Sequence, residues 1–191
     1  MPMETKLNGY TLKIIPDENP LNPRTDCDHL GIMLCWHRRY SLGDSHPYDT
    51  PQDFSESTAA KAVFVCLPVY LLDHSGLYIS VNDFHDPWDS GQLGFIYCTK
   101  KDAQKWFNDP DITEDEIKKE LTAEVEEYND YLNGAWYGFC IEGLNGEVED
   151  SCGGFRYGGS VKELAKEMKS YVSDKYYALF DKFVANNSAY M

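Results

Sequence analysis

Positively charged residues are scarce in this chain of 191 residues: 17 lysines and arginines stand against 32 aspartates and glutamates, which gives a formal net charge of −15. Such a charge repels nucleic acid backbones and anionic membranes, so we expect neither direct DNA or RNA binding nor membrane binding. The same charge would steer the chain toward a basic surface of another protein. Solubility alone is the alternative explanation of the acidic composition.

Long apolar runs are also missing. No stretch approaches the roughly 20 residues that a membrane-spanning helix needs, and the first ten residues lack the charged-then-apolar order of a signal peptide. We therefore expect a cytoplasmic protein. With 42% hydrophobic residues, the chain contains enough apolar side chains to bury an ordinary core.

The common catalytic and metal-binding signatures are absent as well. The sequence has no CxxC pair, P-loop, GxGxxG, GxSxG or HExxH, so the common nucleotide-binding proteins, serine hydrolases and zinc proteases are not expected. A zinc site drawn from the following residues would match no compact zinc motif: Cys27, Cys35, His37 and His46. We expect no metal and no cofactor.

Residues 66–98 carry the strongest β-sheet signal in the chain. Strand-forming runs at 69–72, 77–81 and 93–97 are separated by turn sequences rich in Asp, Ser and Gly. This pattern predicts a three-stranded antiparallel meander. Its turns hold an unusual number of His, Asp and Trp residues, which is compatible with a functional site, but turn and capping chemistry is the favoured interpretation.

The rest of the chain predicts an α+β fold. Further strands are expected at residues 9–15, 30–37, 136–142 and 147–157. A helix is expected near 53–60. Three more are expected to begin after Thr99, Thr113 and Ser160, where N-capping sequences occur. The last of them predicts a long C-terminal helix with a bend near 173–174. We expect one domain over residues 1–191, a mainly antiparallel sheet with helices packed against it, in which 100–133 form a helical insertion or appendage.

The helix predicted after Thr113 is amphipathic. Its apolar stripe consists of Ile117, Leu121, Val125, Tyr128 and Leu132, and its opposite face consists of Asp115, Glu116, Glu120, Glu124, Glu127 and Asp130. Such a face could occupy a basic groove as a phosphate backbone does. The candidate partner-binding residues are therefore Glu120, Glu124, Glu127 and Asp130, together with Trp88.

Trp88 begins a tight turn between Pro87 and Asp89. We expect its indole to cover one end of the core and Asp89 to cap the turn; the alternative is an exposed anchor for a partner. A catalytic alternative uses Cys152 as a thiol nucleophile, His74 as its base and Asp89 to orient the base. A core-facing cysteine beside a glycine bulge is the favoured explanation of Cys152, so we assign no catalytic residue.

Several segments carry a resemblance, and they cover residues 30–31, 35–44, 72–76, 87–92, 94–97 and 150–153. They resemble a family of uncharacterised small proteins of bacteriophages and mobile elements. The resemblance implies that the chain is encoded by a phage or mobile element and acts in the host cytoplasm, and it carries over no activity or catalytic residue. Small acidic proteins of such elements often bind and block host defence proteins. The resulting hypothesis is a non-catalytic, nucleic-acid-mimicking inhibitor of a host system that handles nucleic acids. The alternative is a small-ligand-binding protein or an unusual Cys/His-dependent enzyme.

All six cysteines are predicted to be free thiols, because they share no compact ligand spacing and the expected compartment is reducing. Thiol titration after denaturation should count six per chain, and elemental analysis should find no stoichiometric zinc. A lower thiol count, or one zinc ion per chain, would contradict this prediction.

Overall fold

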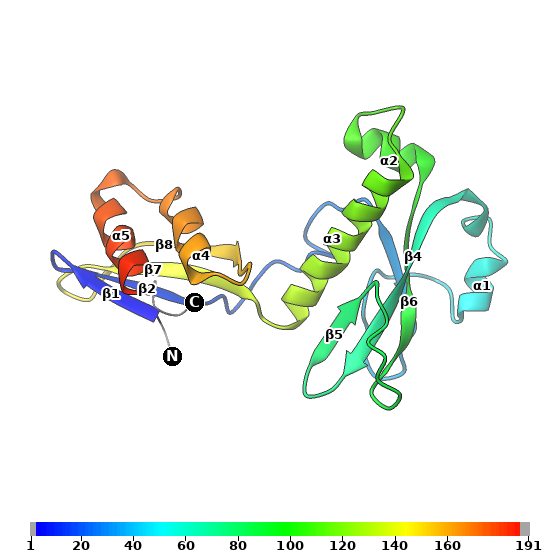
Figure 1. The fold of residues 1–191 in the computed structure, drawn as a ribbon, viewed down its shortest axis with the longest axis horizontal. Helices are drawn as coiled ribbons and strands as arrows, with labels where there is room; N and C mark the ends of the chain where they lie inside the picture. The colour runs from blue at the N-terminus through cyan, green and yellow to red at the C-terminus, as the bar shows by residue number, and fades with distance from the viewer. Residues whose placement is uncertain (1–2, 188–191) are drawn as a thin grey trace. The chain divides into compact units, whose positions relative to one another are not determined.

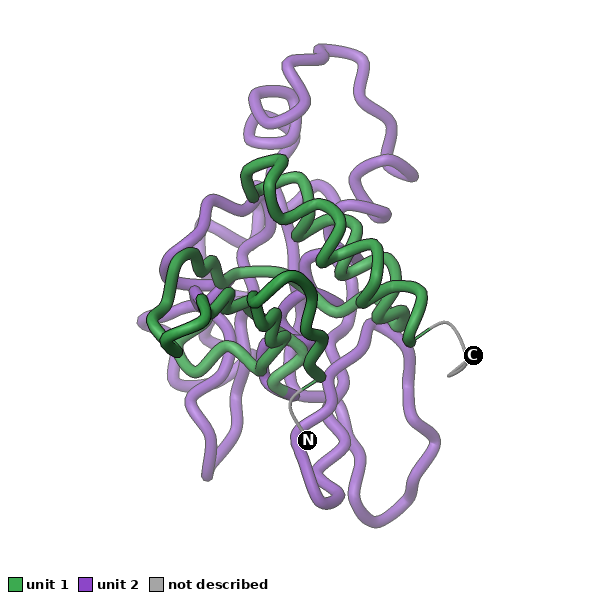
Figure 2. Tube along the Cα trace, turned by 90° about the vertical axis from the view of Figure 1, so that its left-hand side faces the viewer, with its two compact units in different colours: residues 1–20, 134–191 green, residues 21–133 purple. Residues whose placement is uncertain are grey.

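The computed structural model describes residues 3–187, which form two compact units (Figures 1 and 2). Unit 1 joins the two ends of the chain, residues 1–20 and 134–191, and unit 2 comprises residues 21–133. Each unit has a four-stranded antiparallel sheet and its own apolar core. The predicted α+β class is confirmed, and the single domain that we expected consists of two units. Among the residues described, no helix is long and apolar enough to cross a bilayer.

The sheet of unit 1 has the strand order β1-β2-β7-β8. Its strands are β1 (Met3–Leu7), β2 (Tyr10–Pro16), β7 (Trp136–Glu142) and β8 (Val148–Arg156). Asn8 and Gly9 join the first two strands in a tight hairpin, since both have positive φ, 51° and 86°. The sequence analysis did not predict β1, although this Asn-Gly pair is a strong hairpin signal.

The predicted C-terminal helical segment is present, and the bend expected near 173–174 is a complete break between two helices. These are α4 (Val161–Lys169) and α5 (Tyr177–Asn186), with a single 3₁₀ turn, η2 (Asp174–Tyr176), before α5. Ser170 ends α4, because its hydroxyl donates to the Glu167 carbonyl and Ser173 is extended. The break allows both helices to bury apolar residues in the same core. These include Leu164, Met168, Phe180 and Phe183, beside Phe139 of the sheet.

The sheet of unit 2 has the strand order β3-β6-β4-β5, so the predicted meander is wrong. Its strands are β3 (Ile32–Cys35), β4 (Val63–Asp73), β5 (Leu77–Ser80) and β6 (Ser90–Thr99). A meander would pair β6 with β5, which has only 4 residues, whereas β4 has 11. Pairing the two long strands forms more hydrogen bonds, and β6 therefore lies on the other side of β4.

Helices cover the sheet of unit 2 (Figure 1). Their bounds are α1 (Pro51–Ser55), η1 (Ala60–Ala62), α2 (Lys100–Phe107) and α3 (Glu114–Leu132). The predicted N-caps are confirmed: the hydroxyls of Thr99 and Thr113 each accept the backbone N–H three residues later. The buried side chains of α3, such as Ile117 and Leu121, belong to the same core as Ile96 of β6. Residues 100–133 are therefore an integral part of unit 2.

The outer edge of β3 is covered by side chains. The Met33 N–H donates to the Asp44 carboxylate at 2.7 Å, and the Met33 carbonyl accepts from the Asp44 N–H at 2.8 Å. His46 Nε2 bonds the Cys35 carbonyl at 3.1 Å. Gly43 brings Asp44 close enough, because a Cβ there would lie 2.6 Å from the Met33 carbonyl oxygen. These bonds use the groups that another strand would need.

The outer edge of β5 is covered in the same way by α3. The Ile79 N–H donates to Asn129 Oδ1 at 2.9 Å. Asn133 Nδ2 donates to the Leu77 carbonyl at 3.0 Å. Both edges of this sheet therefore have backbone groups engaged by side chains.

A buried ionic network fixes the segment before β3 to α3. The Arg24 side chain is 1% exposed and bonds the carboxylates of Asp44 and Glu124 at 2.6 and 2.9 Å. The Glu124 carboxylate also accepts the N–H groups of Leu30 and Gly31, and Arg24 donates to the Gly31 carbonyl. Each charge of this network thus has an opposite charge and several hydrogen bonds.

Replacing Arg24 by Met should lower the free energy of unfolding by about 3–5 kcal/mol, because two carboxylates would lose their buried counter-ion. Denaturant unfolding measures this difference. Lys118→Ala is the matched control: its ion pairs with Glu114 and Asp115 are exposed, so it should cost less than about 1 kcal/mol. Equal unfolding midpoints for the two variants would show that the network does not stabilise the fold.

Candidate functional site

Three loops of unit 2 come together beside one end of its sheet. They are residues 36–46 after β3, the turn 73–76 between β4 and β5, and residues 86–92, which lead into β6. We call these residues the loop cluster. Three of the segments that carry the sequence resemblance, 35–44, 72–76 and 87–92, contribute to it. Contacts between these loops define the candidate site.

His74 and Asp89 form a pair within the loop cluster. His74 Nδ1 lies 2.7 Å from Asp89 Oδ2, and the His74 side chain is 69% exposed. The hydrogen bond and the charge of Asp89 raise the pKa of His74 above its ordinary value. With Nδ1 bonded to the carboxylate, Nε2 is the ring nitrogen available to a ligand. The structure thus brings together two of the three residues of our catalytic alternative.

Cys152 belongs to the other unit. It lies on β8, half-buried against the core of unit 1, and the following bulge at Gly154 has φ of 84°. The Asp17 carboxylate accepts the Gly154 N–H at 2.9 Å and holds this bulge. A core cysteine beside a glycine bulge, the structural alternative from the sequence, matches this arrangement. In unit 2, burial raises the pKa of Cys35 to about 12 and that of Cys98 to about 11, so neither thiol is a nucleophile near neutral pH.

We expected the Trp88 indole to cover one end of the core. The structure contradicts this expectation, because Trp88 is 90% exposed. The Asp86 carboxylate accepts the N–H groups of Trp88 and Asp89, both at 2.8 Å, and Ser90 Oγ donates to the Asp86 carbonyl. These two N–H bonds lower the pKa of Asp86. The turn cap is therefore Asp86 rather than Asp89, whose side chain bonds His74 instead. The bonded turn holds Trp88 outside the core.

The sequence analysis assigned no role to the run from His37 to Tyr40. The Arg39 guanidinium pairs with the Asp73 carboxylate, to which the Tyr40 hydroxyl also donates at 3.3 Å. The His37 ring stacks on Tyr40 with their centroids 4.9 Å apart. The available signal was two consecutive arginines, Arg38 and Arg39, in a strongly acidic chain.

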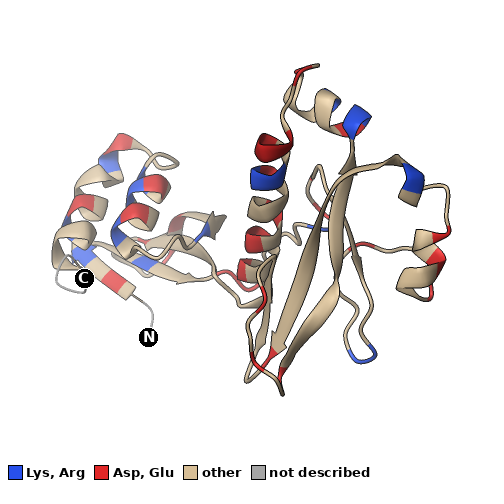
Figure 3. Ribbon diagram, turned by 45° about the vertical axis from the view of Figure 1, so that its right-hand side comes forward, with Lys and Arg blue, Asp and Glu red and all other residues tan. Residues whose placement is uncertain are grey.

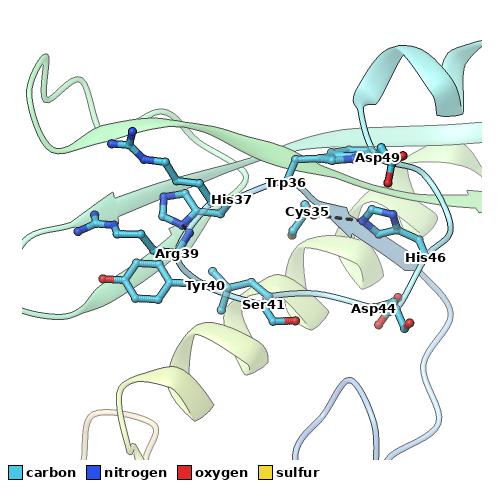
Figure 4. Close-up of a pocket in the computed structure, with 12 residues that line it drawn as sticks. Cys35, Trp36, His37, Arg39, Tyr40, Ser41, Asp44, His46 and Asp49 are labelled. Carbon is cyan, nitrogen blue, oxygen red and sulfur yellow. Dashed lines mark hydrogen bonds between the residues drawn. The ribbon is translucent and has the colours of Figure 1, made fainter.

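Two adjoining cavities open at the loop cluster, with His37 and Arg39 lining both. The larger, of about 700 Å³, is open to solvent and lined by residues between Cys35 and Asp49. The smaller, of about 250 Å³, is lined by Asp73, Trp88 and Asp89 among others. Figure 4 shows His37 and Arg39 at one end of the larger cavity and His46 and Asp49 at the other. In the described part of the chain, no group of three or more His, Cys, Asp or Glu residues could hold a metal ion.

Acidic residues recur along α3 (Figure 3), but the predicted acidic face is only partly available to a partner. Glu124 is 8% exposed and paired with Arg24, so its assignment as a partner-binding residue is wrong. Glu120 is half-buried and accepts from Trp106 Nε1 at 3.1 Å. Glu127 and Asp130 are also half-buried. Glu124 points inward because the strongest available counter-charge, Arg24, lies there.

No family model matches the chain, and no significant match was found among curated proteins or solved structures. The resemblance to proteins of phages and mobile elements therefore stays an expectation. The geometry of the loop cluster is the basis for the functional proposals that follow.

The elevated pKa of His74 leads to a titration experiment. Asp89→Asn should lower that pKa, measured by NMR on the imidazole protons, while Glu126→Gln, a change of an exposed carboxylate on α3, should leave it unchanged. Because the folded pKa is raised, the pair stabilises the fold below the unfolded value of about 6.5, and this contribution is lost as pH rises through the folded pKa. The stability difference between wild type and Asp89→Asn should thus shrink with rising pH. An identical His74 midpoint in both proteins would contradict the assignment.

Proposed function

We propose that the protein acts by binding another protein, with Trp88 as the anchor, and catalyses no reaction of its own. The observation that carries this proposal is the 90% exposure of an indole on a turn already ordered by Asp86. Burying a tryptophan contributes more binding energy than most interface contacts. An ordered turn also loses little conformational entropy when a partner binds.

Charge supports a basic partner. Asp83, Asp86 and Asp89 lie in the same loop as Trp88, and the lowered pKa of Asp86 keeps that carboxylate ionised at neutral pH. A lysine or arginine of the partner would find both an aromatic face and carboxylates there. The net charge of −15 would accelerate the encounter with such a surface.

The finer proposal is that this partner is a host defence protein that handles nucleic acids and is inhibited when the acidic chain occupies its basic groove. Its support is the charge of the chain and the motif resemblance. In this proposal the contact surface is centred on Trp88 and on Asp83, Asp86 and Asp89 of the same loop. Glu120, Glu127 and Asp130 of α3 belong to a second acidic region of unit 2, to which Glu124 does not contribute.

A second candidate is favoured by one specific observation, the His74–Asp89 pair beside two cavities. This arrangement suits a small-ligand-binding protein, or an enzyme in which Asp89 orients His74 as a base. A loss of ligand turnover in His74→Asn at unchanged stability would distinguish this class from a protein that only binds a partner.

Binding experiments with surface variants test the leading proposal. Trp88→Ala should change the free energy of unfolding by less than about 0.5 kcal/mol, because the indole is exposed. In affinity capture from host lysate, a partner retained by wild type should be lost with Trp88→Ala. It should be kept by Leu144→Ala, a control that removes another exposed apolar side chain, 87% exposed in unit 1.

Retained binding of that partner by the Trp88→Ala protein would refute the anchor. For the purified pair, affinity should fall as added salt shortens the Debye length below about 8 Å. An affinity that does not depend on salt would refute the basic partner while leaving the tryptophan anchor in place.

A further inference from the structure

We propose that the larger cavity of the loop cluster binds the phosphate group of a small molecule, with Arg38 as the principal contact and Arg39 and His37 beside it. This site does not require Trp88 to bind a protein. It rests on the donors that line one end of the cavity, on the pairing of the nearby carboxylates and on the size of the space.

Three consecutive residues that line the cavity, His37, Arg38 and Arg39, offer unused hydrogen-bond donors. Figure 4 shows two of them, His37 and Arg39, at the same end of the cavity. Arg38 is exposed, and among the described residues no hydrogen bond or ion pair engages its guanidinium. Arg39 bonds Asp73 through Nη2 and therefore keeps its Nε and Nη1 donors. His37 Nδ1 accepts the Arg39 N–H at 3.4 Å, an assignment that places the ring proton on Nε2.

Two carboxylates near these donors are already paired with arginines, and Asp49, which also lines the cavity, lies at its opposite end. Asp44 is paired with Arg24 and also accepts the Met33 N–H. Asp73 is paired with Arg39 and accepts from Tyr40. Because the net charge of the chain opposes anions, attraction has to come from local groups, and Arg38 is the cation here without an opposite charge of its own.

The chemistry of these groups favours phosphate over other ligands. A guanidinium presents a planar fork that matches two phosphate oxygens at once. Ser41 and Ser45 add hydroxyl donors to the lining, and Trp36 and Tyr40 add aromatic walls. A volume of about 700 Å³ suits a metabolite rather than a free ion, so we assign the site to a phosphorylated small molecule that also carries a ring.

An ion pair and hydrogen bonds fix the position of the loop that carries these donors. Its far end is fixed at Asp44 by the buried Arg24, and Trp36 Nε1 donates to the Tyr48 carbonyl at 3.0 Å. His46 bonds the Cys35 carbonyl. A cavity fixed in this way costs less to order when a ligand binds.

NMR titration with inorganic phosphate tests the site directly. Phosphate should replace chloride at constant ionic strength and neutral pH, while the arginine Nε–Hε signals are followed in the full-length protein. We expect saturable shifts at Arg38 and Arg39. Arg38→Ala should weaken binding about tenfold or more, because a charged hydrogen-bonded contact is lost. The Arg38→Lys variant keeps the positive charge but loses the planar guanidinium fork. Its affinity for phosphate should therefore lie between those of wild type and Arg38→Ala.

Lys119→Ala is the matched control, since it removes one exposed positive charge of unit 2 outside the cavity, and it should bind as wild type does. Trp88→Ala should also bind phosphate normally, which separates this site from the protein-binding proposal. Shifts that never saturate, or equal dissociation constants for wild type and Arg38→Ala, would overturn the inference.

Discussion

The buried contact of Arg24 with Asp44 and Glu124 is the interaction on which unit 2 depends. It joins a loop, the cover of the β3 edge and the middle of α3, three segments that are far apart in the chain. The desolvation free energy of the three charged groups offsets much of the electrostatic attraction between them. Loss of Arg24 would nevertheless leave two carboxylates without their counter-ion, so the network favours one arrangement of these segments. The loop from Cys35 to Asp49 takes its position from that arrangement.

Local signals in the sequence predicted local structure well. The caps at Thr99 and Thr113 and the strand at 136–142 need only neighbouring residues, and the structure has them where they were expected. The order of the strands in the sheet was not predictable in this way, because turn chemistry between β5 and β6 does not reveal that β6 pairs with β4. The contact between Arg24 and Glu124 joins residues 100 positions apart, and no sequence period reports such a pair.

The site was predictable only in part, for the same reason. The sequence shows that the turns after β4 and before β6 contain His74 and Asp89, and the structure brings the two side chains into contact because these strands are adjacent. The sequence does not determine whether an individual side chain faces the core or the solvent. Trp88 faces outward because Asp86 bonds the turn backbone, and Glu124 faces inward because Arg24 is there. A helical pattern cannot distinguish a buried carboxylate that has a partner from a solvated one.

The covered sheet edges of unit 2 have a consequence for self-association. Met33 and Cys35 on one side, and Leu77 and Ile79 on the other, already bond side chains, so a strand of a second molecule finds these groups occupied. Colloidal stability at high concentration thus depends on a few amide and carboxylate groups as well as on net charge. An apolar residue in place of Asn129 would expose the Ile79 N–H, and the first symptom would be association between copies of a still folded chain.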